Sequence, residues 1–309
     1  MEANSDAGSR MQLACPLCTA SRFSAFRWGL LRCAACGIVV NPAVFQPGAA
    51  GVLNEEVFGE EWEPEISFWV RWFESWKNRR YLKTIQRYVR RGRLLEIGVG
   101  SGRFLEAARA AGFEVMGCDL SPAVCRRVEE RIGVKVHCGP LGSLPEGAFD
   151  VVAMHHVLEH VEDPVGFLRD VRRVLAQGGI VHTAVPNVAC WEARFPTWSY
   201  YLPYHLTYFQ RESLARAVRQ AGLVPVWSAS HESFSTWFLL LVRSFLGIRP
   251  DRAPRIAASI GRVPRWWALV EHPYRLAMLG AGVVTWPLRR LQGAVGRGDE
   301  LIIVARAEA

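Results

Sequence analysis

The chain has 309 residues, half of them hydrophobic, which is enough to bury the core of one large domain with an appendage or of two modest domains. Its formal net charge of +8 comes almost entirely from arginine, because Lys77, Lys83 and Lys135 are its only lysines. That balance suits phosphates, nucleic acid or an anionic membrane face, but a solvated surface explains it as well. The charge excludes no partner by itself. The N-terminus, MEANSDAGSR, is polar and has no apolar run behind a basic segment, so we expect no secretory signal and a reducing cytoplasm.

Two C-x-x-C turns stand near the N-terminus: CPLC with Cys15 and Cys18, and CAACG with Cys33 and Cys36. Each turn can direct two thiolates at one tetrahedral zinc ion, and the span between them is about right for a two-stranded ribbon. A redox dithiol is one alternative, although the surrounding βαβ pattern is missing, and four buried thiols without metal are another. We predict a zinc ribbon over residues 11–45, with a closed structural zinc that supplies folding energy.

An alternation of strands and helices begins at Arg93. The segment RLLEIGVGSGRFLEAARAAGFEVMGCDLSP reads as an apolar strand, a glycine turn, an amphipathic helix and a second strand that ends at Asp119. Gly98, Gly100 and Gly102 spell G-x-G-x-G, whereas the dinucleotide fingerprint needs G-x-G-x-x-G, so the spacing disfavours NAD. Glycines let the backbone approach a ligand closely, and an acid that closes the second strand can bind both ribose hydroxyls.

The elements expected next are a strand, a second strand, a helix and a third strand, over residues 134–137, 149–155, 164–176 and 180–185. The helix should stop at Gly178 and Gly179. After a helix that ends at Gly222, VPVWSAS and LIIVARA read as the sixth and seventh strands. Alternating strands and helices predict an α/β fold with a parallel, doubly wound sheet.

Four motifs in this order, EIGVGSG, CDLSP, FDVVAMHHVLEHVEDP and LAQGGIVHTAVPN, resemble those of class I S-adenosylmethionine-dependent methyltransferases. The resemblance covers about residues 79–230 and is close to the branch of the ubiquinone-pathway O-methyltransferases. The leading zinc ribbon is similar to that of many uncharacterised bacterial members and of sugar C-methyltransferases. The resemblance implies an S-adenosylmethionine cofactor and a Rossmann-like seven-stranded methyltransferase sheet, preceded by the zinc ribbon and carrying a helical insertion near the C-terminus.

The family pattern implies positions for cofactor-binding residues. Glu96, Gly98 and Gly100 would lie around the methionine end of the cofactor, and Gly102 completes the glycine loop. Asp119 would hold the ribose. A tight strand-to-helix turn is the alternative role for the glycines, and an ordinary helix cap is the alternative for the aspartate.

Three further residues complete the expected cofactor site. Leu120 would pack beside the adenine. The loop GPLGSLP lacks the small polar or acidic residue that the family normally brings to the adenine amino group, so backbone groups at Leu141 are the expected substitute. His155 ends the fourth strand, where ligands usually bind in such sheets, and its backbone or side chain should touch the cofactor.

About seventy residues separate the last two strands, where relatives often have a short hairpin, so we predict a helical insertion over residues 232–298. It holds ten arginines, three acidic residues and four tryptophans, and its apolar runs are too short to span a bilayer. A surface in peripheral contact with the inner membrane face is one interpretation, and a helical cap over the pocket is the other. Residues 46–92 should form a helical linker or lid, and residues 93–309 the methyltransferase domain.

The string HHVLEHV, residues 155–161, holds three of the chain's eight histidines. It matches the H-x-x-E-H of a zinc protease family, but that motif needs a long helix, and here the string runs from a strand end into a helix start. A plain turn before the next helix is one interpretation. The other comes from small-RNA and ubiquinone-type relatives, in which E-x-x-E-H and a later histidine bind a divalent metal beside the acceptor hydroxyl.

This chain departs from that pattern because His156 stands where the first glutamate would be. Glu159 and His160 match the second glutamate and the histidine of that pattern, and His205 matches the later histidine. These three residues are the catalytic candidates. With His156 they make a set of three histidines and Glu159 that would suit a possible second divalent metal, zinc or manganese, which would lower the pKa of the acceptor. Without a metal, His160 or His205 is the candidate general base.

The motifs say little about the methyl acceptor. The leading hypothesis is a small-molecule hydroxyl on a sugar, a quinone-like compound or a lipid-linked metabolite. An RNA methyltransferase, a sugar C-methyltransferase and a non-catalytic scaffold that binds the cofactor are the alternatives. Nucleic acid is less favoured because the sequence has no RNA-reading motif, although basic residues beside aromatic ones keep RNA open.

Overall fold

The computed structural model describes residues 13–45, 68–202, 204–233, 236–247 and 267–307. Parts of the predicted ribbon, lid and insertion therefore lie outside the described residues: 11–12, 46–67, 234–235 and 248–266.

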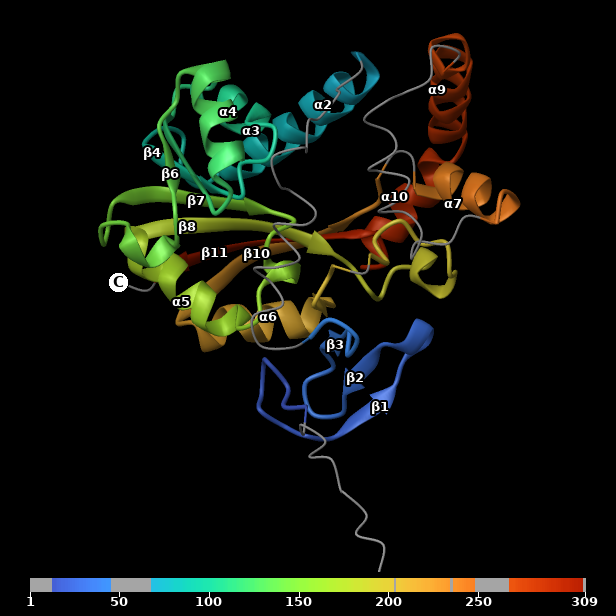
Figure 1. Ribbon diagram of the computed structural model, residues 1–309, viewed down its shortest axis with the longest axis horizontal. Coiled ribbons are helices and arrows are strands. Elements are labelled where there is room, and N and C mark those ends of the chain that lie inside the picture. The colour runs from blue at the N-terminus through green and yellow to red at the C-terminus, as the bar shows by residue number, and fades with distance from the viewer. Residues whose placement is uncertain (1–12, 46–67, 203, 234–235, 248–266, 308–309) are drawn as a thin grey trace, which may run out of the picture.

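The centre of the fold is a seven-stranded sheet with the order β10-β11-β8-β7-β4-β5-β6 (Figure 1). Strands β6, β5, β4, β7 and β8 are parallel, whereas β11 pairs antiparallel with β8 and with β10. This arrangement confirms the predicted Rossmann-like sheet. The strands are β4 Arg93–Ile97, β5 Glu114–Asp119, β6 Val136–Cys138, β7 Phe149–His155, β8 Leu175–Pro186, β10 Leu223–His231 and β11 Glu300–Ala307.

Helices cover both faces of this sheet (Figure 1), and α3, α4, α5 and α6 each bury one apolar side. Helices α2, α3 and α4 lie on one face, and α5 and α6 lie on the other. Buried residues on the two faces form separate clusters, with Tyr81 and Phe104 on the first face and Leu168 and Leu214 on the second. The helices are α2 Phe68–Ile85, α3 Arg103–Ala110, α4 Pro122–Ile132, α5 Pro164–Val174 and α6 Arg211–Gln220.

The predicted boundary between α5 and β8 was wrong. The helix ends at Val174, and β8 begins at Leu175, which is buried and pairs with Phe149. The glycines expected to stop the helix lie inside the strand. A Cβ at Gly179 would lie 3.2 Å from the carbonyl oxygen of Phe149, so glycine allows a close backbone approach at this irregular pairing.

The N-terminal segment forms a small antiparallel sheet that the rest of the chain completes. Strand β3 of this segment pairs with β9, which follows β8 in the chain. The ribbon is therefore attached to the main domain by strand pairing as well as by packing. These strands are β1 Phe23–Ala25, β2 Leu31–Cys33, β3 Val39–Val40 and β9 Thr207–Tyr208, and short 3₁₀ helices are η1 Arg27–Gly29, η2 Leu141–Ser143, η3 Leu158–His160 and η4 Glu192–Arg194.

The segment between β10 and β11 contains helices α7 Thr236–Phe245, α9 Trp267–Val284 and α10 Trp286–Ala294. Helix α10 packs against β10. The buried Gln292 amide donates to Glu192 and Glu232, so one glutamine holds two buried carboxyl groups. Among the described residues, no helix has the length and apolar character needed to cross a membrane.

Candidate functional site

The glycine turn after β4 is shaped by close contacts. Gly98 has a φ of 72° and donates its N–H to the Cys118 carbonyl of β5 at 2.8 Å. A Cβ at this position would lie 2.6 Å from Cγ2 of Val157, which follows β7. Only glycine satisfies both the backbone conformation and this packing. Gly98 therefore lets the ends of β4, β5 and β7 pack closely together.

Asp119 ends β5 and ties the glycine turn to the start of α4. One carboxylate oxygen accepts the Val99 N–H at 3.1 Å, and the other accepts the Ser121 N–H at 3.0 Å. Burial raises the pKa of Asp119, and these backbone donors oppose that effect. The cap of α4 is the Ser121 hydroxyl, which accepts the Val124 N–H at 3.4 Å. Leu120 beside it is 62% exposed.

A cavity of about 120 Å³ opens beside the carboxyl ends of β4 and β7. Of the predicted cofactor residues, Glu96 and His155 line it. Glu96 is buried, burial raises its pKa, and its Oε2 atom has no hydrogen-bond partner within the described part of the chain. Leu141 belongs to another region: its side chain is in the core, and its carbonyl accepts from Arg173 Nη2 at 3.0 Å.

One wall of this cavity comes from α2, which the sequence analysis treated only as a linker or lid. Glu74, Lys77, Asn78 and Tyr81 line the cavity from successive turns of the helix. Their spacing of three and four residues is the signal of a shared helical face, but no motif marks it. Sequence reasoning therefore missed these four side chains.

His155 points between two aromatic groups. Its ring stacks on Tyr81 with centroids 4.1 Å apart, and its Nε2 lies 3.1 Å from Nδ1 of His182. Burial holds the pKa of His155 well below its usual value, and burial also lowers the pKa of His182 to about 4. Both imidazoles are therefore neutral near pH 7, and His155 forms an uncharged wall of the cavity.

His156 lies between two buried glutamates. Its Nδ1 is 3.3 Å from Glu159 Oε1, and its Nε2 is 3.2 Å from Glu300 Oε1. Burial alone would lower the pKa of His156, but the two carboxylates outweigh burial and raise it to about 9. The Tyr81 hydroxyl donates to the same Glu300 oxygen at 2.5 Å. This cluster connects β7, α2 and β11, and neither Tyr81 nor Glu300 was predicted.

The three catalytic candidates come together behind this cluster. Ligand atoms of Glu159, His160 and His205 all lie within 4.8 Å of one another. Glu159 Oε2 and His205 Nδ1 are buried and have no hydrogen-bond partner among the residues that the structure describes. Burial lowers the pKa of His205 to about 3, so its imidazole is neutral. His156, the fourth predicted ligand, is not part of this group. It lines the cavity, whereas the lining does not include Glu159, His160 or His205.

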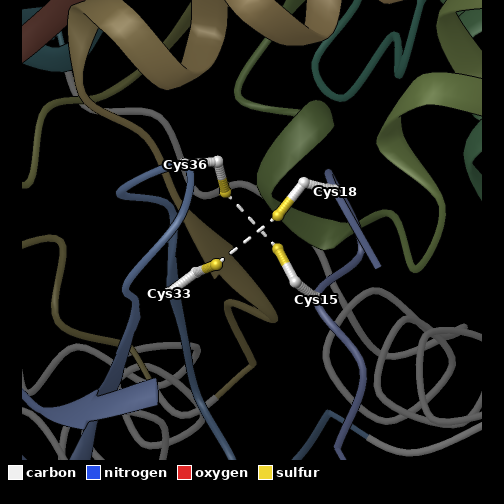
Figure 2. A group of neighbouring side chains, drawn as sticks. All are labelled: Cys15, Cys18, Cys33 and Cys36. Carbon is white, nitrogen blue, oxygen red and sulfur yellow. Dashed lines mark hydrogen bonds between the residues drawn. The ribbon is translucent and has the colours of Figure 1, made fainter. Parts of the chain in front are cut away.

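The four N-terminal cysteines form the second candidate centre. Figure 2 shows their sulfur atoms directed at one point from two turns. Cys15 Sγ and Cys36 Sγ are 3.4 Å apart, Cys18 Sγ and Cys33 Sγ are 3.5 Å apart, and all four are free thiols. Four thiolates around tetrahedral zinc, with Zn–S bonds of about 2.3 Å, would be separated by roughly 3.8 Å, so the donor set fits this metal.

Residues 73–228, about half of the chain, match a family model described as a methyltransferase domain. With the Rossmann-like sheet around the site, this match places the chain in the methyltransferase-domain family.

Similar curated proteins overlap the chain only in part. An uncharacterized protein of Methanocaldococcus jannaschii is 36% identical over 101 residues, which are 32% of this chain and 46% of that protein. A ubiquinone biosynthesis O-methyltransferase of Caulobacter sp. is 38% identical over 105 residues, 31% of this chain and 41% of that protein. The chain thus spans less than half the length of the curated relatives that it matches.

Solved structures support the fold over a longer range. The 1,6-didemethyltoxoflavin-N1-methyltransferase of Burkholderia thailandensis, with S-adenosylhomocysteine bound, has a TM-score of 0.51 and 16% identity. The alignment covers 90% of this chain and 99% of that one. A SAM-dependent methyltransferase of Archaeoglobus fulgidus has a TM-score of 0.50 and 19% identity, with 83% and 98% covered. At these identities the similarity shows the fold alone.

The glycine turn yields a stability prediction. Gly98→Ala should lower the free energy of unfolding by about 1–3 kcal/mol, because it adds backbone strain and a clash with Val157. In urea unfolding, Gly98→Ala combined with Val157→Ala should lose less than the two single changes together. Gly142→Ala, which adds a methyl group in open space, is the control. Equal effects of Gly98→Ala and Gly142→Ala would contradict the packing described for this turn.

Proposed function

We propose that the chain transfers a methyl group from S-adenosylmethionine to a small-molecule acceptor, most simply to a hydroxyl. The observation that carries this proposal is the cavity at the carboxyl ends of β4 and β7, in a domain of the methyltransferase family. Open α/β sheets bind their ligands in this position. The S-adenosylhomocysteine in the Burkholderia thailandensis relative and the names of the ubiquinone-pathway relatives support the cofactor and the reaction class.

The residues present fit this cofactor. Glu96 offers an unpaired buried oxygen in the cavity, and a Cβ at Gly100 would meet nothing within 4 Å, so the loop leaves room for a ligand. The cavity holds only part of the cofactor, and we assign it to the methionine end. Asp119 would bind the ribose, and the exposed Leu120 would cover the adenine. The Leu141 carbonyl already accepts from Arg173, so the backbone N–H of Leu141 is the group that we propose for the adenine contact.

Alignment and exclusion of water are the main tasks of the protein in this reaction. The cofactor supplies an activated methyl group whose sulfonium is already a good leaving group. The acceptor must be held in line with the methyl group, and burial of the site by α2 keeps water away. His155, Tyr81 and His156 form the wall that an acceptor would meet. A hydroxyl acceptor also needs to lose its proton, so a basic group is required nearby.

Glu159, His160 and His205 are the groups that we propose for this proton transfer. Two of them present buried polar atoms with no hydrogen-bond partner among the described residues, which leaves these atoms available to a ligand. One carboxylate and two imidazoles are suitable ligands for zinc or manganese and leave coordination positions open. A bound divalent metal would supply Lewis acidity that lowers the pKa of the acceptor hydroxyl. Without it, His160, which is partly exposed, is the better base.

Two observations support the proposed acceptor class. A sugar, quinone-like or lipid-linked hydroxyl agrees with the ubiquinone biosynthesis names among the relatives. The apolar and basic insertion over residues 232–298 agrees with an acceptor that has an apolar part. Peripheral contact of this insertion with a membrane stays a proposal, as does the division of the chain at residues 11–45, 46–92 and 93–309.

We further propose that Cys15, Cys18, Cys33 and Cys36 hold one structural zinc. A closed set of four thiolates leaves no open position for chemistry, so the metal would stabilise the ribbon. The ribbon would in turn support the site. Strand β3 pairs with β9, which begins two residues after His205, and the Leu206 N–H donates to the Glu159 carbonyl at 2.9 Å.

The cofactor proposal predicts a specific loss of affinity. In isothermal titration, Asp119→Ala should weaken the binding of S-adenosylmethionine by about tenfold or more, because the ribose loses its carboxylate partner. Asp170→Ala, at an exposed position of α5, is the matched control and should bind like the unmodified chain. Unchanged affinity of Asp119→Ala would refute the assignment of the ribose site.

The acceptor class is tested without choosing a substrate. A cell extract incubated with the chain and with cofactor labelled in its methyl group is separated into organic, aqueous and macromolecular fractions. A quinone-like or lipid-linked acceptor predicts label in the organic fraction, and a sugar predicts label in the aqueous fraction. Label confined to RNA would contradict a small-molecule acceptor, and no transfer in any extract would favour a non-catalytic scaffold.

The proton-transfer proposal predicts separate effects on turnover and binding. His160→Ala and His205→Ala should each reduce turnover by about tenfold or more while leaving cofactor affinity nearly unchanged. A second metal equivalent in the unmodified chain, lost in Glu159→Ala, would identify these groups as metal ligands rather than a simple base. If both histidine variants turn over about as fast as the unmodified chain, residues 155–161 have a structural role only.

The zinc proposal predicts about one zinc per chain in metal analysis under reducing, chelator-free conditions. Cys15→Ser combined with Cys18→Ser should abolish this metal and lower the midpoint of thermal unfolding. Cys138→Ser is the control, because this exposed thiol lies outside the four-cysteine group. Absence of zinc from the unmodified protein would end this assignment.

A further inference from the structure

A second and larger cavity, of about 710 Å³, is lined by a different face of α2 together with β10, α9 and α10. We call it the Trp–Arg groove. Its volume falls in the range of small-molecule sites, about 300–1,000 Å³. The residues that define the groove are Trp72, Trp76, Arg80, Val283, Trp286 and Arg290.

The walls of the groove are apolar and open to solvent. Trp72 is 42% exposed, Trp76 is 41% exposed and Trp286 is 57% exposed, and Val283 lies on the same rim. The two α2 tryptophans are one helical turn apart, so they form a continuous indole surface. Large aromatic side chains gathered in a concave surface mark a binding site better than scattered exposed residues do.

Two arginines of the groove lining lie beside its tryptophans. The Arg80 guanidinium lies 4.9 Å from the Trp76 ring centroid, and that of Arg290 lies 5.9 Å from the Trp286 centroid. Burial lowers the pKa of His231 to about 4, and the charges of Arg80 and Arg290 act in the same direction, whereas the Glu300 carboxylate, outside the groove lining, opposes them. Arg80 of α2, Arg290 of α10 and His231 of β10 therefore line the same groove.

No ionised acid of the groove lining offsets these arginines. Glu232 is the carboxyl group in the lining, and its Oε2 already accepts from Gln292 and from the Asp299 N–H. Burial raises the pKa of Glu232 to about 11, so this group is uncharged near neutral pH. Nη2 of Arg80 is buried and has no hydrogen-bond acceptor within the described ranges. An anion would satisfy it.

We propose that the Trp–Arg groove binds one molecule of an anionic amphiphile, with an apolar alkyl or isoprenoid chain against the tryptophans and a phosphate between Arg80 and Arg290. Two guanidinium groups match a phosphate better than they match a singly charged head group. The concave shape favours a single bound molecule over a flat bilayer surface. The apolar walls also offer few polar groups to recognise a nucleotide base. This binding site does not depend on which molecule is methylated.

Isothermal titration with dodecyl phosphate, below its critical micelle concentration, tests the proposal. We expect saturable binding of one molecule per chain. Dodecanol, which lacks the anion, and inorganic phosphate, which lacks the chain, should each bind about tenfold more weakly or worse. Arg80→Gln with Arg290→Gln should weaken dodecyl phosphate by about tenfold, and Trp286→Ala should do the same.

Matched controls separate the groove from the general surface. Arg219→Gln, at an exposed position of α6, and Trp28→Ala, an exposed tryptophan of the ribbon, should leave binding unchanged. Trp286 is more than half exposed, so its truncation should leave the thermal unfolding midpoint nearly unchanged and keep the test valid.

Several results would overturn the proposal. They are no binding of dodecyl phosphate, binding of many molecules per chain, or equal loss in the control variants. Tight binding of single-stranded RNA that depends on Arg80 and Trp286 would assign the groove to nucleic acid instead. Binding to anionic vesicles without saturable binding of the monomeric amphiphile would assign it to a membrane surface.

Discussion

The buried contacts of His156 with Glu159 and Glu300 hold together the parts of the chain on which the site depends. The histidine follows β7, Glu300 begins β11, and the Tyr81 hydroxyl of α2 binds the same Glu300 oxygen. Breaking a buried charge pair by removing one partner typically costs about 3–5 kcal/mol, because the other charge is left uncompensated in the interior. One small cluster therefore fixes the helix that closes the cavity and the strand that ends the long insertion.

The Tyr81–Glu300 contact holds α2 in a position from which it lines both cavities. One face of the helix carries Lys77 and Tyr81 to the small cavity, and another face carries Trp76 and Arg80 to the Trp–Arg groove. The N-terminal ribbon supports the opposite side of the site through β9 and the contact between Leu206 and Glu159. Segments from the beginning, middle and end of the sequence therefore meet around the end of β7.

Local patterns in the sequence predicted the sheet, because apolar runs, glycine turns and terminal acids each act over a few residues. They located β5 up to Asp119 and β7 up to His155. They misplaced the end of α5, where tertiary pairing of Leu175 outweighed the glycine signal. The α2 wall carries no motif, and Glu300 reaches His156 across 144 positions of the chain, a contact that no local pattern contains. The catalytic candidates could be proposed because a family string marks them, and the structure places Glu159, His160 and His205 close together.

The most direct measurement is a crystal structure of the chain with S-adenosylhomocysteine bound. We predict the amino-acid end of the ligand in the cavity against Glu96, its ribose hydroxyls on the Asp119 carboxylate, and α2 in place above it through the Tyr81–Glu300 contact. A ligand bound elsewhere, or a cavity that stays empty at saturating ligand while α2 keeps this position, would contradict the assignment of the site.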